Sequence, residues 1–148
     1  MRVYLAVYWL LQWTWGILQN IAGLFLLLLN FRREHRIFHG AVVTSWNNPG
    51  YSTGLGMFIF MSENIPEEDY KRTLVHEYGH TVQSAILGVL FLPVVGIPSM
   101  LWAVTPAFKR YRREKRVSYY RFYPERWANS LGERVTKSPS IGQKLIDL

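Results

Sequence analysis

The stretch His76-Glu77-Tyr78-Gly79-His80 is an H-E-x-x-H motif. In a helix, residues four apart lie one turn apart on the same face, so both imidazoles can reach one metal ion. Glu77 lies about 100° around the helix from His76, beside the open position of the metal and outside its ligand set. Its carboxylate can there take a proton from a zinc-activated water and pass it to a leaving amine. The motif therefore predicts His76 and His80 as zinc ligands and Glu77 as the general base.

The motif lies in a segment with a clear helix start. Pro66 suits the first helical position, and Glu67, Glu68 and Asp69 favour the positive end of the helix dipole. The sequence predicts a helix over residues 66–90, with the motif in its middle.

A catalytic zinc site needs a third protein ligand and keeps one position open. Glu125 is the best-placed candidate, because Pro124 presets the first turn of a second helix over residues 124–137. The alternative reading of Glu125 is a charge that the helix dipole favours. Glu63 and Glu133 are weaker ligand candidates.

The surroundings of the third ligand resemble those in the gluzincins, zinc peptidases that pair H-E-x-x-H with a later glutamate in a helix. Many gluzincins carry E-x-x-A-D there, and this chain has Glu125-Arg126-Trp127-Ala128-Asn129. The resemblance implies that Asn129 orients a ligand histidine by accepting its imidazole N–H, without the negative charge of the usual aspartate.

A wider resemblance covers roughly residues 54–132. The Phe-Ile-Phe of residues 58–60, the motif at 76–80, the Gly-Ile-Pro-Ser of 96–99 and the stretch 125–129 are together similar to small bacterial membrane proteins with a zincin-like core. The similarity implies a zinc site and a bacterial inner membrane, and it identifies no substrate. The chain lacks the later Asp-Gly motif of site-2 proteases, which argues against that family.

Composition limits the chemistry further. The chain has 148 residues, which suits one domain. It contains no cysteine, which excludes a disulfide, a thiolate zinc site and a cysteine nucleophile. Net charge is +7, and 49% of the residues are hydrophobic. Such a balance predicts an anionic partner, and the apolar clusters favour anionic membrane lipids over nucleic acid, for which no binding motif is present.

The first apolar block, residues 3–29, contains no charged residue. A bilayer span needs about 20 apolar residues, so the sequence predicts an N-terminal transmembrane helix over residues 1–31. Arg32, Arg33 and Arg36 then read as a cytoplasmic flank. The alternative is a buried core helix.

A second apolar block, residues 85–104, is interrupted by Gly88 and Pro93 among others. It either spans once or enters the membrane and returns as a hairpin. The basic cluster at 109–116 favours the hairpin, which keeps both basic flanks on the cytoplasmic side. Residues 32–148 are therefore expected to form a membrane-associated domain with its active site near the cytoplasmic face.

Residues 37–62 have the pattern of a β-hairpin. The runs 41–46 and 57–61 are rich in strand-forming residues, and Asn-Asn-Pro-Gly at 47–50 is a turn signal. In zincins, an edge strand next to the metal helix binds extended substrate by strand addition. The strand at 55–61 is the expected edge here.

Other polar residues have open roles at this point. Tyr119, Tyr120, Tyr123 and His39 are all candidates to stabilise an oxyanion, and the alternative for each is an interfacial or core position. His35 and His39 are also four apart, but with no useful acid nearby they read as interfacial rather than as a second metal site.

Taken together, these features predict a mainly α membrane protein with a small β-hairpin and a zincin-like core, in which the H-E-x-x-H helix meets a second, Glu-bearing helix. The expected function is a membrane-bound Zn²⁺-dependent hydrolase, a peptidase, with His76, His80 and Glu125 as ligands, Glu77 as base and a peptide or protein as substrate. The alternative is a non-catalytic membrane protein with a structural or interface zinc. The oligomeric state is left open.

Overall fold

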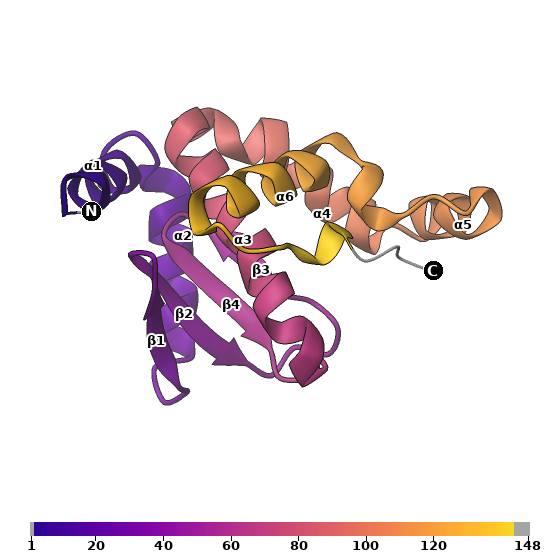
Figure 1. Cartoon of the computed structure of the whole chain (residues 1–148), viewed down its shortest axis with the longest axis horizontal. Helices are drawn as coiled ribbons and strands as arrows, with labels where there is room; N and C mark the ends of the chain where they lie inside the picture. The colour runs from indigo at the N-terminus through magenta and orange to yellow at the C-terminus, as the bar shows by residue number, and fades with distance from the viewer. Residues whose placement is uncertain (1, 144–148) are drawn as a thin grey trace.

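The computed structural model describes residues 2–143 and is 65% helical with one small sheet (Figure 1). The α-helices of this part are α1 (Arg2–Trp13), α2 (Ile17–Leu29), α3 (Glu67–Leu87), α4 (Ile97–Val104), α5 (Pro106–Lys115) and α6 (Tyr123–Thr136). The strands are β1 (His35–Phe38), β2 (Ala41–Trp46), β3 (Thr53–Leu55) and β4 (Phe58–Ser62). Short helical turns cover Gly88–Leu90, Leu92–Gly96, Tyr119–Arg121 and Ile141–Gln143.

The strands form one mixed sheet in the order β1-β2-β4-β3. β1 and β2 are antiparallel and are joined by a tight turn at His39 and Gly40, which both have positive φ, 46° and 86°. A two-residue turn with positive φ at both positions matches the twist of neighbouring antiparallel strands. The antiparallel hairpin of this sheet is therefore β1–β2, which begins at His35, before the predicted hairpin of residues 37–62.

The predicted hairpin of residues 41–46 and 57–61 is wrong in its pairing. β2 and β4 are parallel neighbours, with Val42 opposite Phe58. The physical reason is β3, which follows the 47–52 loop and pairs antiparallel with β4 after the chain turns at Gly56, where φ is 61°. As a result β3, and not β4, is the edge strand on this side of the sheet.

The hydrophobic core lies between the sheet and α3. β4 is buried along its whole length, because β2 and β3 flank it and α3 covers it. The core cluster consists of Ala41, Val43, Ile59, Met61, Leu74 and Tyr78. This packing fixes α3, the helix with the H-E-x-x-H motif, across the sheet.

The predicted ends of α3 and α6 are close to the observed ones. α3 begins directly after Pro66, has three acidic residues in its first turn, and ends at Gly88, where φ is 57°. α6 covers nearly the predicted 124–137 and ends at Lys137, where φ is 55°. α5 ends at Lys115, within the basic cluster of residues 109–116, because Arg116 takes a left-handed conformation and stops the helix.

Two glycines allow α3 and α6 to cross closely. A β-carbon on Gly79 would collide with the backbone carbonyl of Ala128, and one on Gly132 would collide with that of Val75. The crossing is the most extensive helix pair among the described residues, and Figure 1 shows α6 lying over α3. It brings residue 125 next to the motif.

The predicted transmembrane helix over residues 1–31 is wrong, and with it the expectation of a membrane-spanning fold. Among the described residues no single helix is long and apolar enough to cross a membrane, and α1 and α2, which together have the length and composition, are bent by 92°. The bend lies at Gly16, where Gln12 and Gln19 come together and both contact Ser84 of α3. These polar contacts hold the two helices around α3 in a bent pair.

The second apolar block, residues 85–104, is divided into short pieces. The chain turns at Gly88, passes through two irregular helical turns and continues as α4, so the apolar helical stretch is limited to Leu92–Val104. α5 follows directly and projects away from the rest of the molecule (Figure 1).

Candidate metal centre

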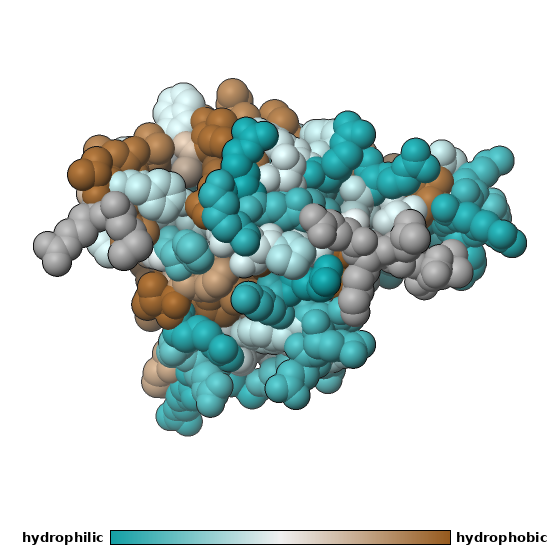
Figure 2. Space-filling view, in the orientation of Figure 1, coloured by the Kyte–Doolittle hydropathy of each residue, from teal (hydrophilic) through white to brown (hydrophobic). Residues whose placement is uncertain are grey.

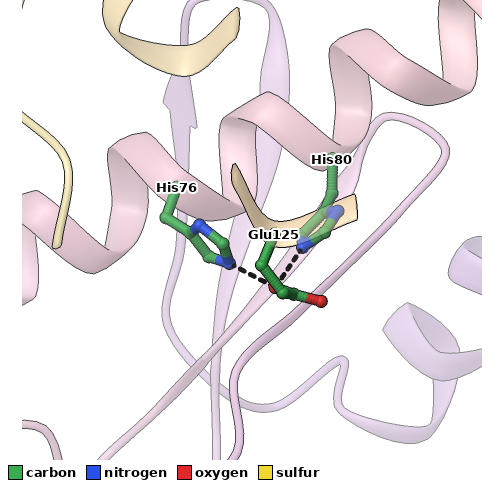
Figure 3. A group of neighbouring side chains, drawn as sticks. All are labelled: His76, His80 and Glu125. Carbon is green, nitrogen blue, oxygen red and sulfur yellow. Dashed lines mark ion pairs between the residues drawn. The ribbon is translucent and has the colours of Figure 1, made fainter. Parts of the chain in front are cut away.

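Three buried side chains from two helices converge on one point. His76 and His80 project from neighbouring turns of α3, and Glu125 projects from the first turn of α6 (Figure 3). Glu125 Oε2 lies 3.1 Å from His76 Nε2 and 3.3 Å from His80 Nε2. The three ligand atoms lie within 4.8 Å of one another, so this group could hold a metal ion.

The outward-facing atom of each of these side chains is held by a second polar group. His76 Nδ1 lies 2.8 Å from Asn129 Oδ1, which is the contact that the gluzincin resemblance implied. His80 Nδ1 lies 2.7 Å from Gln83 Oε1, and the Ser99 hydroxyl donates to Glu125 Oε1. With Nδ1–H donated outward, each histidine presents the lone pair of Nε2 to the common point.

The inward-facing oxygen of Glu125 is buried and faces only the two histidine Nε2 atoms, with no other hydrogen-bond partner. A buried carboxylate oxygen that faces only the lone pairs of neutral histidines carries a desolvation cost, which a cation at this point would offset. The donor set of two imidazoles and one carboxylate, with one position left open, is one that zinc takes in catalytic sites. The residues therefore fit the ion that the motif implies.

The charges of the metal-free centre are strongly coupled. Burial alone would lower the pKa of His80, but the Glu125 carboxylate outweighs it and raises the pKa above its usual value. Burial alone would raise the pKa of Glu125, and the neighbouring histidines instead hold it below its usual range. Without a metal, a protonated His80 and an ionised Glu125 therefore form a buried ion pair.

Glu77 is buried beside the centre but lies outside the ligand group. The backbone of Gly54 in β3 makes a hydrogen bond to its carboxylate, and β3 and α3 approach closely there. Burial raises the pKa of Glu77, while His76 and His80 partly oppose the shift. A carboxylate with a raised pKa is better suited to accept and return a proton near neutral pH.

A groove of about 900 Å³ gives access to the centre, and His76, Glu77, His80 and Glu125 all line it. The β3 edge forms one wall, and the segment from Leu92 to α4 forms another. Lys109 also lines the groove and donates a hydrogen bond of 3.0 Å to the Tyr51 hydroxyl. The site is therefore open to a ligand considerably larger than water.

Tyr120 is the best placed of the four residues considered for oxyanion stabilisation. Its ring packs edge-on against His76 with 4.9 Å between ring centroids, and it lines the groove. Burial and then the charges of Glu77 and Glu125 raise its pKa, so its hydroxyl stays protonated and able to donate. Tyr119 also lines the groove, but its hydroxyl makes a hydrogen bond with Ser99.

The other two candidates lie elsewhere. The hydroxyl of Tyr123 donates to the carbonyl of Val94, and His39 packs against Phe38 and Tyr78 on the far side of α3 from the groove lining. Neither is available to a substrate in the groove.

The weaker metal-ligand candidates also have other partners. Glu63 forms an ion pair with Arg33, Glu133 accepts hydrogen bonds from Ser140, and His35 bonds to Thr44. None of these acids or histidines belongs to a ligand cluster in the part of the chain that the structure describes.

Two supporting residues were missed by the sequence analysis. Gln83 holds His80 and also donates to the carbonyl of Pro124, which links the ligands of α3 and α6. Its position three residues after His80 on the same helix face was a usable signal. Ser99 comes from a distant helix, so only the fold reveals its contact with Glu125.

Comparisons of this chain with protein-family models, with curated proteins and with solved structures find no match.

Proposed function

We propose that this protein is a Zn²⁺-dependent hydrolase that cleaves peptide bonds. The observation that carries the proposal is the convergence of three inward-facing ligand atoms, from His76, His80 and Glu125, with the Glu77 carboxylate beside them in an open groove. Imidazole and carboxylate ligands suit zinc, and three protein ligands leave one position free for chemistry.

The residues around the centre have complementary roles in this reaction. A bound zinc ion supplies Lewis acidity, which polarises a carbonyl oxygen and makes water more acidic. Glu77 accepts a proton from the attacking water and then donates it to the leaving amine. The Tyr120 hydroxyl donates a hydrogen bond to the oxygen that gains negative charge.

The edge strand β3 supports a peptide as the substrate. β3 lies at the margin of the sheet and lines the groove beside Glu77, so an extended peptide can pair with it as an added strand. The edge strand was expected at residues 55–61. Because β4 is enclosed between two strands, the edge strand is instead β3, Thr53–Leu55.

A structural zinc site is the rival reading. Structural zinc usually has four protein ligands and no base beside it. The ligand cluster found among the described residues has three members, and Glu77 is buried next to it. Both observations favour the catalytic reading.

The first test is the zinc content of purified protein, measured by elemental analysis in the wild type and in His80→Ala, Glu125→Ala and Glu77→Gln. We expect one zinc per wild-type chain, loss of zinc in the first two variants and retention in the third. Glu63→Ala is the matched control, because Glu63 is an acid outside the cluster and should leave the zinc content unchanged. Wild-type protein that takes up no zinc after reconstitution would overturn the proposal.

A further inference from the structure

The polarity of α2 is reversed relative to that of a helix on a water-soluble core. Its buried residues are Gln19, Asn20 and Gly23. Its exposed face carries Leu18, Ile21, Phe25, Leu28 and Leu29, each more than half exposed. In a protein surrounded by water the apolar face points inward and the polar face outward. Polar residues that face protein and apolar residues that face outward are typical of helices in contact with lipid.

Each buried amide of α2 makes hydrogen bonds that hold the helix in this orientation. Gln19 donates hydrogen bonds of 2.8 Å to Ser84 and to the carbonyl of Gly88, and Asn20 accepts one of 2.8 Å from the backbone N–H of Met57. Turning the apolar face inward would break these bonds, so the outward direction of the leucines is fixed by the polar contacts.

α1 has the same reversed pattern. Gln12 is completely buried, donates to the carbonyl of Thr81 and accepts from Ser84. Its large exposed residues are Val3, Tyr4, Val7, Trp9, Leu10 and Trp13. Tryptophan and tyrosine are the residues enriched where a membrane meets water.

The last turn of α3 and the segment after it extend this surface. Trp15 donates to the carbonyl of Ile86, and Gln19 bonds to Gly88, so the bend between α1 and α2 lies directly against it. The large exposed residues here are Ile86, Val89, Leu90, Val94, Ile97, Met100, Leu101 and Val104. In Figure 2 the hydrophobic colour gathers over α1 and over this segment, which Figure 1 shows side by side. The exposed apolar residues of α1, α2 and residues 86–104 are called the apolar face below.

Positive charge flanks the apolar face at two places. Arg32 is exposed directly after α2. α5 follows α4 and exposes Lys109, Arg110, Arg113 and Lys115, and Arg116 is exposed just after it. Apolar surface beside exposed basic side chains complements a membrane whose anionic head groups lie next to its hydrocarbon, and each such charge attracts the surface. Large contiguous exposed apolar patches are rare on soluble monomers and mark surfaces that contact a partner or a membrane.

We propose that the apolar face inserts into one leaflet of an anionic lipid bilayer. α1 has 12 residues and α2 has 13, so each is about 20 Å long or less, against a hydrocarbon thickness of about 30 Å. The 92° bend prevents the two from adding their lengths. The protein therefore lies on one side of the membrane, with the polar contacts of α1 and α2 turned towards α3.

This placement also orients the groove of the metal centre. Ile97, Met100 and Val104 are exposed on the apolar face and line the groove as well, so they form a shared rim. A groove with this rim opens at the lipid surface. Lipid insertion goes beyond the proposed hydrolysis and does not depend on it. The narrower expectation, that substrates approach along the membrane, rests on the proposed function.

The first test is co-flotation of purified protein with vesicles of phosphatidylcholine alone and of phosphatidylcholine mixed with phosphatidylglycerol. We expect the wild type to float with the mixed vesicles, and Phe25→Gln/Leu28→Gln to partition at least about tenfold more weakly, since two large apolar side chains are lost from the inserted face. Asn47→Ala/Ser130→Ala changes two exposed polar positions elsewhere and should float like the wild type. The result should be the same for zinc-free protein and for Glu77→Gln, which separates this test from that of the hydrolase.

A second test reads the inserted residues directly and does not require a loss of binding. Because the chain has no cysteine, single variants Leu29→Cys, Leu101→Cys and Ser130→Cys each carry one environment-sensitive fluorophore. We expect a blue shift on vesicle addition at the first two positions and none at Ser130. Equal spectra at all three positions, or concentration-dependent self-association that shields Leu29 and Leu101 without vesicle binding, would overturn the proposal.

Discussion

At the scale of single residues, the carboxylate of Glu77 has a position that differs from that of the ligands. It is buried beside them and held by the backbone of Gly54. We expect Glu77→Gln to bind zinc as tightly as the wild type and to lose about 10²- to 10⁴-fold in turnover, because the amide cannot take a proton from water. Zinc titration and cleavage of a fluorescently labelled unstructured protein measure the two effects. A variant with wild-type turnover would contradict the role of Glu77 as base.

Substitution of Asn129 tests whether a second polar group is needed to hold His76 in place. Its amide oxygen accepts from His76 Nδ1 at 2.8 Å, which fixes the ring and leaves Nε2 free. Asn129→Ala should weaken zinc binding about 10- to 100-fold, as measured by competition with a chelator. Asn129→Asp keeps an acceptor and adds negative charge, so its zinc affinity should equal or exceed that of the wild type. Unchanged affinity in Asn129→Ala would remove the supporting role.

We expect His80 to make zinc binding depend on pH. Against the effect of burial, Glu125 raises the pKa of His80 above 6.5, so the metal-free protein keeps His80 protonated at neutral pH. Zinc must displace this proton, and its apparent affinity should therefore rise with pH through the neutral range until His80 is neutral without metal. Calorimetry in buffers of different ionisation enthalpy should detect the released proton. An affinity that is independent of pH over this range would contradict the coupling.

At the scale of elements, the crossing of α3 and α6 positions the third ligand. A β-carbon at Gly79 would collide with the carbonyl of Ala128, which is three residues from Glu125. Gly79→Ala should lower the free energy of unfolding by about 1–3 kcal/mol and weaken zinc binding, because the helices must move apart. Gly96→Ala is the control: its added methyl would have ordinary contacts, and stability should hold or rise. Chemical denaturation of both variants measures the two changes in the free energy of unfolding.

The helices and strands also show which parts of the fold are determined by the local sequence. The start of α3 at Pro66 and its end at Gly88 depend on local chemistry, and the sequence predicts both closely. The parallel pairing of β2 and β4 depends on where a three-residue strand returns, and no local pattern encodes that. The bend at residue 16 depends on partners of Gln12 and Gln19 that lie far along the chain, so a charge-free block reads as one straight helix.

At the scale of the whole molecule, zinc would join α3 to α6 and remove a buried ion pair. A ligand that binds only the folded protein stabilises it, by about 2.7 kcal/mol when present at 100 times its dissociation constant. The thermal midpoint should therefore rise with zinc concentration and fall with a chelator. His80→Ala should respond to neither. A wild-type midpoint unchanged by zinc and chelator would argue against a metal centre in the folded protein.

The candidate metal-binding group was largely predictable from the sequence, and its surroundings were not. The period of a helix alone places His76 and His80 on one face, and Pro124 predicts the start of the helix that carries Glu125. Ser99 and Tyr120 reach the site only through the path of α4 and the turn before α6, which side-chain packing decides. Sequence reasoning could therefore name the candidate ligands but could not rank the tyrosines.

The polar contacts of α1 and α2 also determine when the protein can finish folding. The partners of Gln12 and Gln19 lie 65 to 72 residues further along the chain, so both helices leave the ribosome long before α3 can receive them. At a synthesis rate of about 5–20 residues per second, this interval is on the order of ten seconds. Throughout it the nascent segment carries unpaired amides on one side and bare leucines on the other. A chaperone or a membrane that receives this segment early would protect it from aggregation until the later half of the chain arrives.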